Sequence, residues 1–360
     1  MHEFESGFFV KQPAWHGLGT VLQQPPTVQE ALKLAGLDWT VRTERLGRMT
    51  VPVGLNQETG IVEAAAPTPV FTPANRWAVV RESDNTELGT VGPKWRALQN
   101  EKALGWFQPI VDAGLATLEA AGSLRAGARV WVLARITGGR DVIVEEANDA
   151  VDRFILLAHG HDGALAIRCG LTFVRVVCNN TLQAALSGDE LIRILHGTRA
   201  EETLAAAREV ITRANGRFDE AAKIYRALAQ VKNVGAAQLR AFVEAAFPRP
   251  VGPKNGGGSG GDGGGNTPAP EVDGQETKSR IYDDVARLFE SGQGAQLPGV
   301  KGTAWAAYNA MTEWLTHERG KDAEIRLNNS FFGPEGGRAI AAAIDTFLPG
   351  YHDEVDTKGV

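Results

Sequence analysis

RFILLAHGHDGALAIRCGLTFVRVVCNNTLQAAL, residues 153–186, is the stretch from which the fold class is predicted. Residues 154–158 are an apolar run of strand length, and the turn HDG follows at 161–163. Asp-Gly between two apolar runs is a strong hairpin signal, because both central residues of such a turn need a positive φ. Residues 164–169 then provide the returning strand. The stretch therefore predicts an antiparallel pair.

The second half of this stretch predicts a third strand and then a helix. Residues 172–178 (TFVRVVC) are rich in β-branched side chains, which suit a half-buried pleated surface, and Gly170 allows a bend before them. Asn179 or Asn180 can cap a helix that begins near Thr181, because an asparagine side chain accepts a hydrogen bond from an otherwise unpaired backbone N–H.

Outside this stretch, the hydrophobic pattern alternates between strands and helices. The sequence TVQE at 27–30 is a capping box that predicts a helix to about residue 35. A second helix is expected over 101–113 with Asn100 as its cap. Strands are expected at 39–46, 76–82, 88–91, 117–121, 129–136 and 141–145. One mainly antiparallel sheet with an inserted helix and a helical layer is the simplest arrangement, so we predict an α+β fold.

The predicted organisation is a sheet-bearing core between helical segments. From residue 189 the apolar spacing becomes helical, and residues 252–265 (GPKNGGGSGGDGGG) have almost nothing to bury. We expect an N-terminal arm with a capping helix at 1–39, an α+β core at 40–187, a helical layer at 188–248, a flexible Gly/Pro-rich linker at 249–277, a C-terminal helical segment at 278–350 and a polar tail at 351–360.

Composition restricts the classes of function. The formal net charge is −6, so an anionic ligand must meet a local basic patch, because the net charge of the molecule would repel it. Cys169 and Cys178 are too few for a disulfide framework or a structural zinc site, and they fit a reducing cytoplasm. The N-terminus has no basic region of a signal peptide, and no run approaches the roughly 20 apolar residues of a membrane span. We expect a cytoplasmic protein without membrane contact.

Cations within the predicted strands are the most suggestive functional feature. Arg129 and Arg135 are six residues apart and therefore share one face of a strand, and Arg168 and Arg175 lie in neighbouring predicted strands. Aligned arginines could pair with successive phosphates. The alternative is that they are the polar positions of ordinary one-sided strands, paired with nearby acids.

Residues 94–96 add a different pattern. Trp95 stands between Lys94 and Arg96, and an aromatic ring between two cations can stack a base while the cations hold its backbone. The seven cations and aromatics are thus predicted to bind DNA, with no cofactor and no metal. A third reading takes His159 and His161 with a carboxylate as the metal ligands of a hydrolase. No nucleophile motif or acid–base pair supports other covalent chemistry, and we expect no catalytic residue.

Four blocks in chain order resemble the DUF932 family of phage- and plasmid-like proteins. They are MHEFESGFFVKQPAWHGLGTVLQQPPTVQEALKLAGLDWTV at 1–41, LGTVGPKWRALQNEKAL at 88–104, HDGALAIRCGLTFVRVVCNNTLQAAL at 161–186 and GTAWAAYNAMTEWLTHERG at 302–320. The glycine tract departs from that pattern. The resemblance implies a mobile genetic element, and by analogy of setting and fold it is similar to phage single-strand annealing proteins with a Rad52-like core.

The sequence thus favours a non-enzymatic, oligomeric protein that binds and anneals single-stranded DNA in recombination or replication. The first alternative is a protein-interaction module that counters a host function, for which an exposed apolar patch is expected. The metal-dependent hydrolase is the second alternative.

Overall fold

The computed structural model describes residues 4–11, 19–51, 53–55, 62–64, 70–165, 167–177, 181–183, 200–248, 274–321, 326 and 335–351. The chain divides into two compact units that interleave along the sequence. Unit 1 is Met1–Thr137, Ile155–Gly170 and Glu190–Ile211, and unit 2 is Gly138–Phe154, Leu171–Asp189 and Thr212–Val360. Most of the predicted linker, 249–273, lies outside the described residues.

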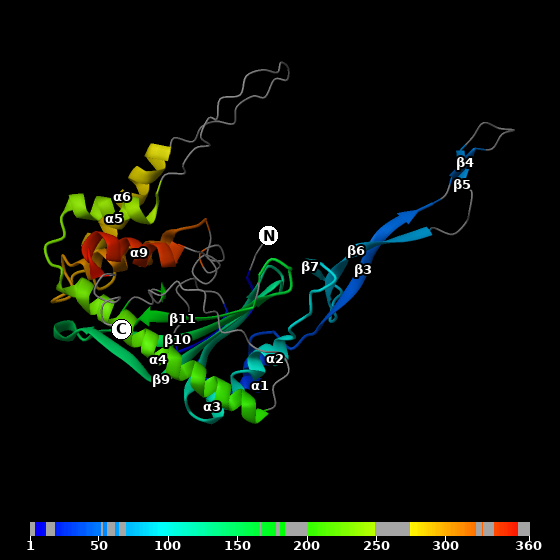
Figure 1. Ribbon diagram of the computed structural model, residues 1–360, viewed down its shortest axis with the longest axis horizontal. Helices are drawn as coiled ribbons and strands as arrows, with labels where there is room; N and C mark the ends of the chain where they lie inside the picture. Colours follow the sequence, from blue (N-terminus) through cyan, green and yellow to red (C-terminus); the bar gives the residue numbers. More distant parts are fainter. Residues whose placement is uncertain are drawn as a thin grey trace, which may run out of the picture. The chain divides into compact units, whose positions relative to one another are not determined.

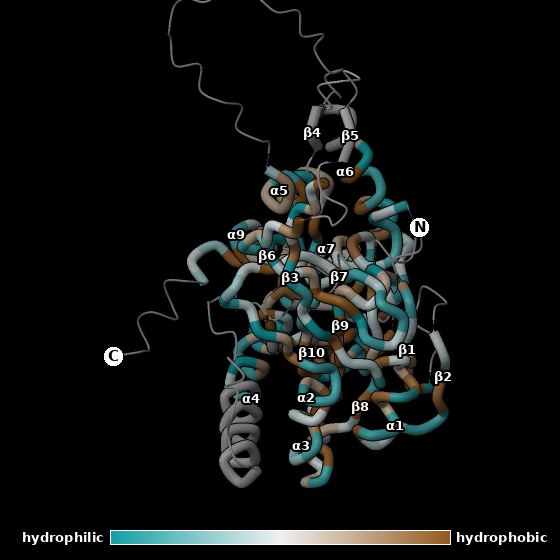
Figure 2. The backbone as a smooth tube through the Cα atoms, turned by 90° about the vertical axis from the view of Figure 1, so that its right-hand side faces the viewer, coloured by the Kyte–Doolittle hydropathy of each residue, from teal (hydrophilic) through white to brown (hydrophobic). Residues whose placement is uncertain are grey.

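The fold is α+β, as predicted, with a mixed seven-stranded sheet. Its strand order is β12-β11-β10-β9-β8-β1-β2. Figure 1 shows the neighbouring strands β9, β10 and β11. The strands are β1 (Phe4–Val10), β2 (Thr20–Leu22), β8 (Ala116–Leu124), β9 (Arg129–Val144), β10 (Asp149–Gly160), β11 (Arg168–Arg175) and β12 (Thr181–Gln183). Strands β9 and β10 carry long hydrophobic stretches, which are brown in Figure 2. Because β9 and β10 have neighbours on both edges, such stretches suit their central places in the sheet.

The N-terminal arm is the first departure from the prediction, which placed no strand before residue 39. Strand β1 pairs antiparallel with β8 and parallel with the short β2. The Phe8 side chain is fully buried, and the Ser6 hydroxyl donates to the carbonyl of Ala35 over 2.6 Å. The N-terminal segment therefore contributes an integral strand, whose partner β8 lies more than one hundred residues away in sequence.

The stretch at 153–186 forms strands, with three differences from its prediction. The turn at 161–163 is part of a longer loop, in which Asp162 Oδ1 accepts from the N–H groups of Ala164 and Leu165 and Gly163 has a φ of 73°. Strand β11 then runs through Gly170 without a break. Thr181 begins the short strand β12, antiparallel to β11, so the helix predicted there is wrong; its proposed caps, Asn179 and Asn180, lie outside the described residues.

The helices follow the predicted order but not all predicted lengths. They are α1 (Val28–Leu34), α2 (Asn100–Gly105), α3 (Gln108–Asp112), α4 (Ala200–Gln230), α5 (Ala236–Ala246), α6 (Gly274–Ser291), α7 (Ala304–Glu313) and α9 (Glu335–Phe347), with a 3-10 turn (Glu145–Ala147) and a π turn (Trp314–Glu318). The capping box of Thr27 and Glu30 is confirmed. The helix expected over 101–113 is two short helices, since Pro109 lies at the start of α3.

Asn100 illustrates how tertiary contacts displace a local preference. Its side chain does not cap α2, which begins after Gln99 without a side-chain cap. Instead, Asn100 Nδ2 donates to the carbonyl of Leu37 over 3.1 Å and to that of Trp39 over 3.4 Å. The residue is buried and links α2 to the segment that precedes β3.

The core of unit 2 is aromatic. The ring centroid of Phe173 in β11 lies 4.7 Å from that of Phe218 and 5.3 Å from that of Tyr225, both in α4. Tyr225 also lies 5.1 Å from Trp305 of α7. Rings at these separations stabilise the packing of the helices on the strand.

Unit 1 contains a second sheet, of order β3-β6-β7. Strand β3 (Val41–Thr50) pairs antiparallel with β6 (Val70–Arg81), and β7 (Glu87–Val91) pairs only with the end of β6 from Trp77 to Val80. Beyond Trp77, β3 and β6 continue as a two-stranded ribbon toward the short strands β4 (Val53–Leu55) and β5 (Val62–Ala64) (Figure 1). We call this ribbon, together with the part of β3 that leads into it, the arm (residues 42–50 and 70–77). In the described residues no helix is long and apolar enough to cross a membrane.

Candidate nucleic-acid interface

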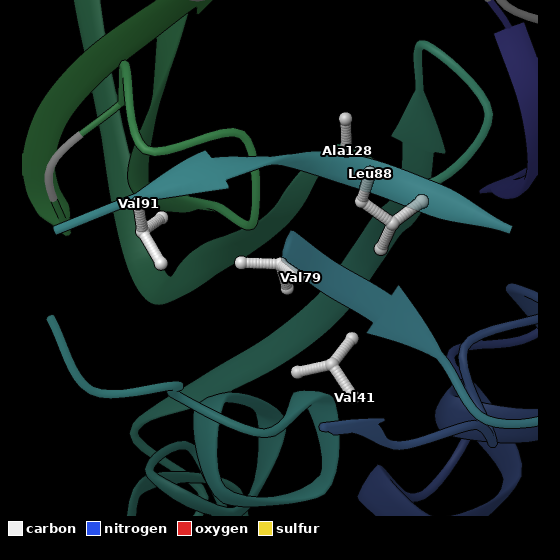
Figure 3. Packing of buried hydrophobic residues seen from close by; sticks show 5 residues of the cluster. All are labelled: Val41, Val79, Leu88, Val91 and Ala128. Atoms are coloured by element: carbon white, nitrogen blue, oxygen red, sulfur yellow. The ribbon is translucent and has the colours of Figure 1, made fainter. Parts of the chain in front are cut away.

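A small apolar cluster stands where the arm begins. It consists of Val41, Val79, Leu88, Val91 and Ala128, whose side chains gather between β3, the hairpin β6–β7 and the loop before β9 (Figure 3). Three partly buried tryptophans pack against it, namely Trp39, Trp77 and Trp95. A tryptophan that is only partly covered keeps some of its surface in solvent. We call these five residues the arm-base cluster. Three aromatic rings pack against it near the surface of unit 1.

The Trp77 ring carries a cation. Arg45 lies opposite Trp77 in the β3–β6 register, and its Cζ atom is 5.6 Å from the ring centroid. The Arg45 side chain is exposed, and its Nε donates to the carbonyl of Ala74 over 3.2 Å. A guanidinium beside an indole is held by the quadrupole of the ring while its remaining N–H groups stay available to a ligand.

The predicted Lys94-Trp95-Arg96 group lies at the same cluster. Trp95 follows the end of β7 by a turn in which its N–H donates to the carbonyl of Gly92 over 3.2 Å. Lys94 and Arg96 are exposed on either side of it, and Arg96 Nη1 donates to the carbonyls of Pro93 and Trp95. The structure thus brings the three predicted residues together with Arg45 and Trp77, which the sequence did not single out.

Arg129 is close to this cluster in sequence but is committed to an ion pair. It follows Ala128, a cluster member, and its Nε donates to Asp162 Oδ2 over 3.1 Å. Both side chains are mostly buried. Burial raises the pKa of Asp162, but its hydrogen bonds from Ala164, Arg129 and Leu165 outweigh this, so the pKa is lowered. The pair therefore fixes the loop that begins at His161 to the start of β9.

Arg135 is likewise committed to an acidic partner. Arg135 is paired with Glu119 of β8 across 2.9 Å and is one-third exposed. Arg168 begins β11, and its side chain lies outside the described residues. For Arg129 and Arg135, the structure therefore agrees with the alternative drawn from the sequence, in which strand arginines are paired with nearby acids.

Arg175 is part of the core of unit 2. Its guanidinium is fully buried, and its Nε and Nη2 donate to the carboxylate of Asp149 over 2.9 and 2.7 Å. Nη1 donates to the carbonyl of Gln293 over 3.1 Å, and Asp149 also accepts from the indole N–H of Trp305 over 2.8 Å. A phosphate cannot reach this guanidinium, and the expected role of Arg175 in DNA binding is corrected to a structural one.

The histidines of the metal alternative form a buried pair in unit 1. The ring centroids of His159 and His161 are 5.0 Å apart, and His161 Nε2 lies 3.1 Å from Asn100 Oδ1. Since Asn100 Nδ2 already donates to two carbonyls, its Oδ1 accepts, and Nε2 is the protonated nitrogen of His161. Burial lowers the pKa of His159 to about 3, helped by His161, and burial lowers that of His161 to about 4 against the opposing charge of Asp162.

This pair does not assemble a metal centre in the part of the chain that the structure describes. The neighbouring carboxylate, Asp162, is bound to Arg129 and to two backbone N–H groups. Among the described residues no group of three histidine, cysteine, aspartate or glutamate side chains could hold a metal ion. The two histidines are better described as neutral, buried members of the unit 1 core.

The arm supplies cations that sequence reasoning missed. Arg42, Arg45 and Arg48 recur every third residue in β3, and Arg76 lies in β6; Glu44 is the one acid among residues 42–50 and 70–77. The predicted strands ended at residue 46 and resumed at residue 76. The arm could have been predicted from the spacing of Arg42, Arg45 and Arg48, because this three-residue spacing continues past residue 46.

Comparison with known proteins places the chain in a family. A sequence model of the family described as "Domain of unknown function (DUF932)" matches residues 87–332, more than two-thirds of the chain. The chain belongs to the DUF932 family. No curated protein and no solved structure matches it. The match begins at the first residue of β7, so it includes Lys94, Trp95 and Arg96, whereas the arm precedes it.

Proposed function

We propose that this DUF932 protein binds single-stranded DNA at the arm-base cluster and acts as an oligomeric annealing protein in recombination or replication of a mobile genetic element. It performs no covalent chemistry. The observation that supports this most strongly is the gathering of partly exposed Trp77 and Trp95 with the exposed cations Arg45, Lys94 and Arg96 around one cluster.

The residue types suit an unpaired strand better than a duplex. Bases of a single strand are free to stack on an indole, and stacking tolerates any base sequence because every base has a π face. Lysine and arginine beside the rings neutralise the phosphates that accompany those bases. In a duplex the base faces are already stacked on one another, so Trp77 and Trp95 would have nothing to stack on.

The charge of the molecule supports a local site of this kind. The chain carries a net charge of −6, whereas the arm contains four arginines and one glutamate. A basic segment on an acidic protein directs a polyanion to one place and disfavours binding elsewhere. Cytoplasmic location follows from this proposed role.

Fluorescence anisotropy of a labelled oligonucleotide across a salt series tests the proposal. We expect tighter binding to a single strand than to the matching duplex, and affinity that falls steeply as salt rises. Replacing both Lys94 and Arg96 by alanine removes two phosphate contacts and should reduce the salt slope by about 1.4, at about 0.7 per contact for single strands. Arg140→Ala, which removes an exposed arginine paired with Asp152 in unit 2, is the matched control. Absence of binding at low salt would reject the proposal.

The alternative of a protein-interaction module is favoured by one observation, the exposed apolar side chains at the outer end of the arm and at Val51, the residue that follows β3. Met49, Val51, Val70 and Phe71 are each about half exposed. If the protein binds no DNA at low salt, this patch makes capture of a protein partner the next function to test.

A further inference from the structure

Strand β3 has an open edge along the arm. It is the terminal strand of its sheet, so the backbone groups on one side have no strand partner among the described residues. That edge is closed at its first residue, because the side-chain amide of Gln99 accepts from the N–H of Val41 over 2.9 Å and donates to its carbonyl over 2.8 Å. Backbone groups alternate in direction along a strand, so the outward-facing groups beyond Val41 belong to Thr43, Arg45, Gly47 and Met49.

The opposite edge of the arm is less suited to pairing. On β6, Pro73 has no N–H to donate, and the register with β3 shifts between Arg45 and Gly47 so that extra β6 residues lie opposite them. Proline and irregular backbone are the features that block pairing at an edge. Strand β3 lacks both over Arg42–Thr50, and six of these nine residues are exposed, with Arg42, Leu46 and Thr50 partly so.

We propose that β3 pairs antiparallel with β3 of a second copy of this chain, in the register centred on Leu46, to join two arms into a four-stranded sheet. This pairing gives the oligomer of the proposed function a specific interface, and in that respect it rests on the proposed function. The test of the pairing uses no DNA. The two copies are related by a two-fold axis, so every contact occurs twice.

Charge complementarity selects this register. Hydrogen-bonded pairs must join outward-facing residues of both copies, which places Thr43 opposite Met49 and Arg45 opposite Gly47 of the second copy. On the other face, Glu44 lies opposite Arg48 of the second copy and Arg48 opposite its Glu44. Within its own arm Arg48 faces Thr72, so it has no acid opposite it in the β3–β6 register. Opposite charges directly across a strand pair are stabilising.

Neighbouring registers lose this match. Centring the pair on Arg45 sets Arg45 opposite itself and Arg42 opposite Arg48, and centring it on Arg48 sets Arg48 opposite itself. Like charges directly opposite each other are destabilising. Centring on Gly47 aligns no acid with a base. Of the four registers, only the one centred on Leu46 pairs all nine residues from Arg42 to Thr50. It also places two leucines at its centre and forms two Glu44–Arg48 contacts.

Disulfide trapping tests the interface. Leu46 lies at the two-fold axis in a non-hydrogen-bonded pair, where Cα atoms are about 4.5 Å apart and a disulfide can form. In a chain with Cys169→Ser and Cys178→Ser, we expect Leu46→Cys to give a covalent dimer on oxidation. Thr50→Cys is the matched control, because Thr50 faces Arg42 of the second copy, and it should stay monomeric.

A charge swap supplies an independent readout by sedimentation equilibrium of the protein alone. Glu44→Arg turns two attractive contacts into repulsive ones and should weaken the dimer by about 5- to 30-fold. Adding Arg48→Glu to it restores the two contacts between the copies and should recover most of the lost affinity, while the Arg42–Glu44 pair within each strand stays broken. A monomer at tens of micromolar, equal trapping of both cysteine variants, or no recovery in the swapped chain overturns the proposal. DNA binding by a monomer would leave the proposed function standing.

Discussion

Arg175 and Asp149 form a buried ion pair in unit 2, with Nη2 and Oδ2 2.7 Å apart and side chains that are 1% and 0% exposed. The same carboxylate accepts from Trp305, and the guanidinium also donates to the carbonyl of Gln293. The pair therefore ties strands β10 and β11 to the C-terminal helical segment. Removing one partner leaves an uncompensated charge in the core.

We predict that Arg175→Met lowers the free energy of unfolding by about 3–5 kcal/mol, because Asp149 stays buried without its counter-charge. Urea denaturation followed by tryptophan fluorescence measures this change. Arg140→Met, which breaks the largely exposed pair with Asp152, is the control and should cost less than about 1 kcal/mol. Equal small effects of the two substitutions would show that Arg175 is not a structural residue.

The buried histidines predict sensitivity to acid. The pKa of His159 is about 3 and that of His161 about 4 in the folded chain, against about 6.5 when unfolded. The unfolded state therefore binds protons that the folded state does not, so stability is unchanged by these groups above about pH 6.5 and falls as the pH decreases toward 4. Two protons give a slope of about 2.7 kcal/mol per pH unit near pH 5.

The test is urea denaturation between pH 7 and pH 4.5. His159→Phe removes one of the two titrating rings and should reduce the slope to about 1.4 kcal/mol per pH unit. Gly92→Ala, which changes no titrating group and meets no atom within 4 Å, should leave the slope as in the wild type. If His159→Phe had the wild-type slope, the acid sensitivity would have another source.

Gly89 of β7 allows the backbone at Asp162 to approach closely. A Cβ atom at Gly89 would lie 2.5 Å from the Cα of Asp162. We predict that Gly89→Ala lowers the free energy of unfolding by about 1–3 kcal/mol, since one backbone must shift. Gly92→Ala is the matched control, because a Cβ atom there meets nothing within 4 Å. Thermal unfolding compares the two, and an equally stable Gly89→Ala protein would contradict the close approach.

Base stacking predicts a graded response at Trp77. Trp77→Leu removes the ring and should weaken single-strand binding by about 5- to 150-fold, the cost of losing one stacked base. Trp77→Phe retains a π face and should recover a large part of the affinity. Because Trp77 also packs on the arm-base cluster, thermal unfolding of both variants must show a folded protein. Equal affinity of Trp77→Leu and the wild type would contradict stacking at this ring.

Local features of the fold were predictable from the sequence, whereas long-range pairings were not. The capping box at Thr27 and Glu30 depends on residues three apart, and it is present as predicted. Strand β1 was missed because its partner β8 is distant in sequence and its irregular composition gives no period. At Thr181 an asparagine pair resembled a helix cap, but pairing with β11 decided the outcome.

The candidate site shows the same division. Lys94, Trp95 and Arg96 are adjacent in sequence, and their shared place could be proposed directly. The burial of Arg175 depends on its ion pair with Asp149, which lies 26 residues earlier. No spacing rule predicts that a strand arginine will pair with that carboxylate. The contribution of Arg45 and Trp77 required the β3–β6 register, which joins residues 32 apart.

Photocrosslinking tests the central claim most directly. A single strand containing 5-bromodeoxyuridine is irradiated with the protein at saturating concentration, and the crosslinked peptides are identified by mass spectrometry. We predict crosslinks in the peptides that contain Trp77 or Trp95, because bases stacked on these rings lie in contact with them. Crosslinks confined to peptides of unit 2, or none under saturating conditions, would contradict the assignment of the arm-base cluster as a single-stranded-DNA site.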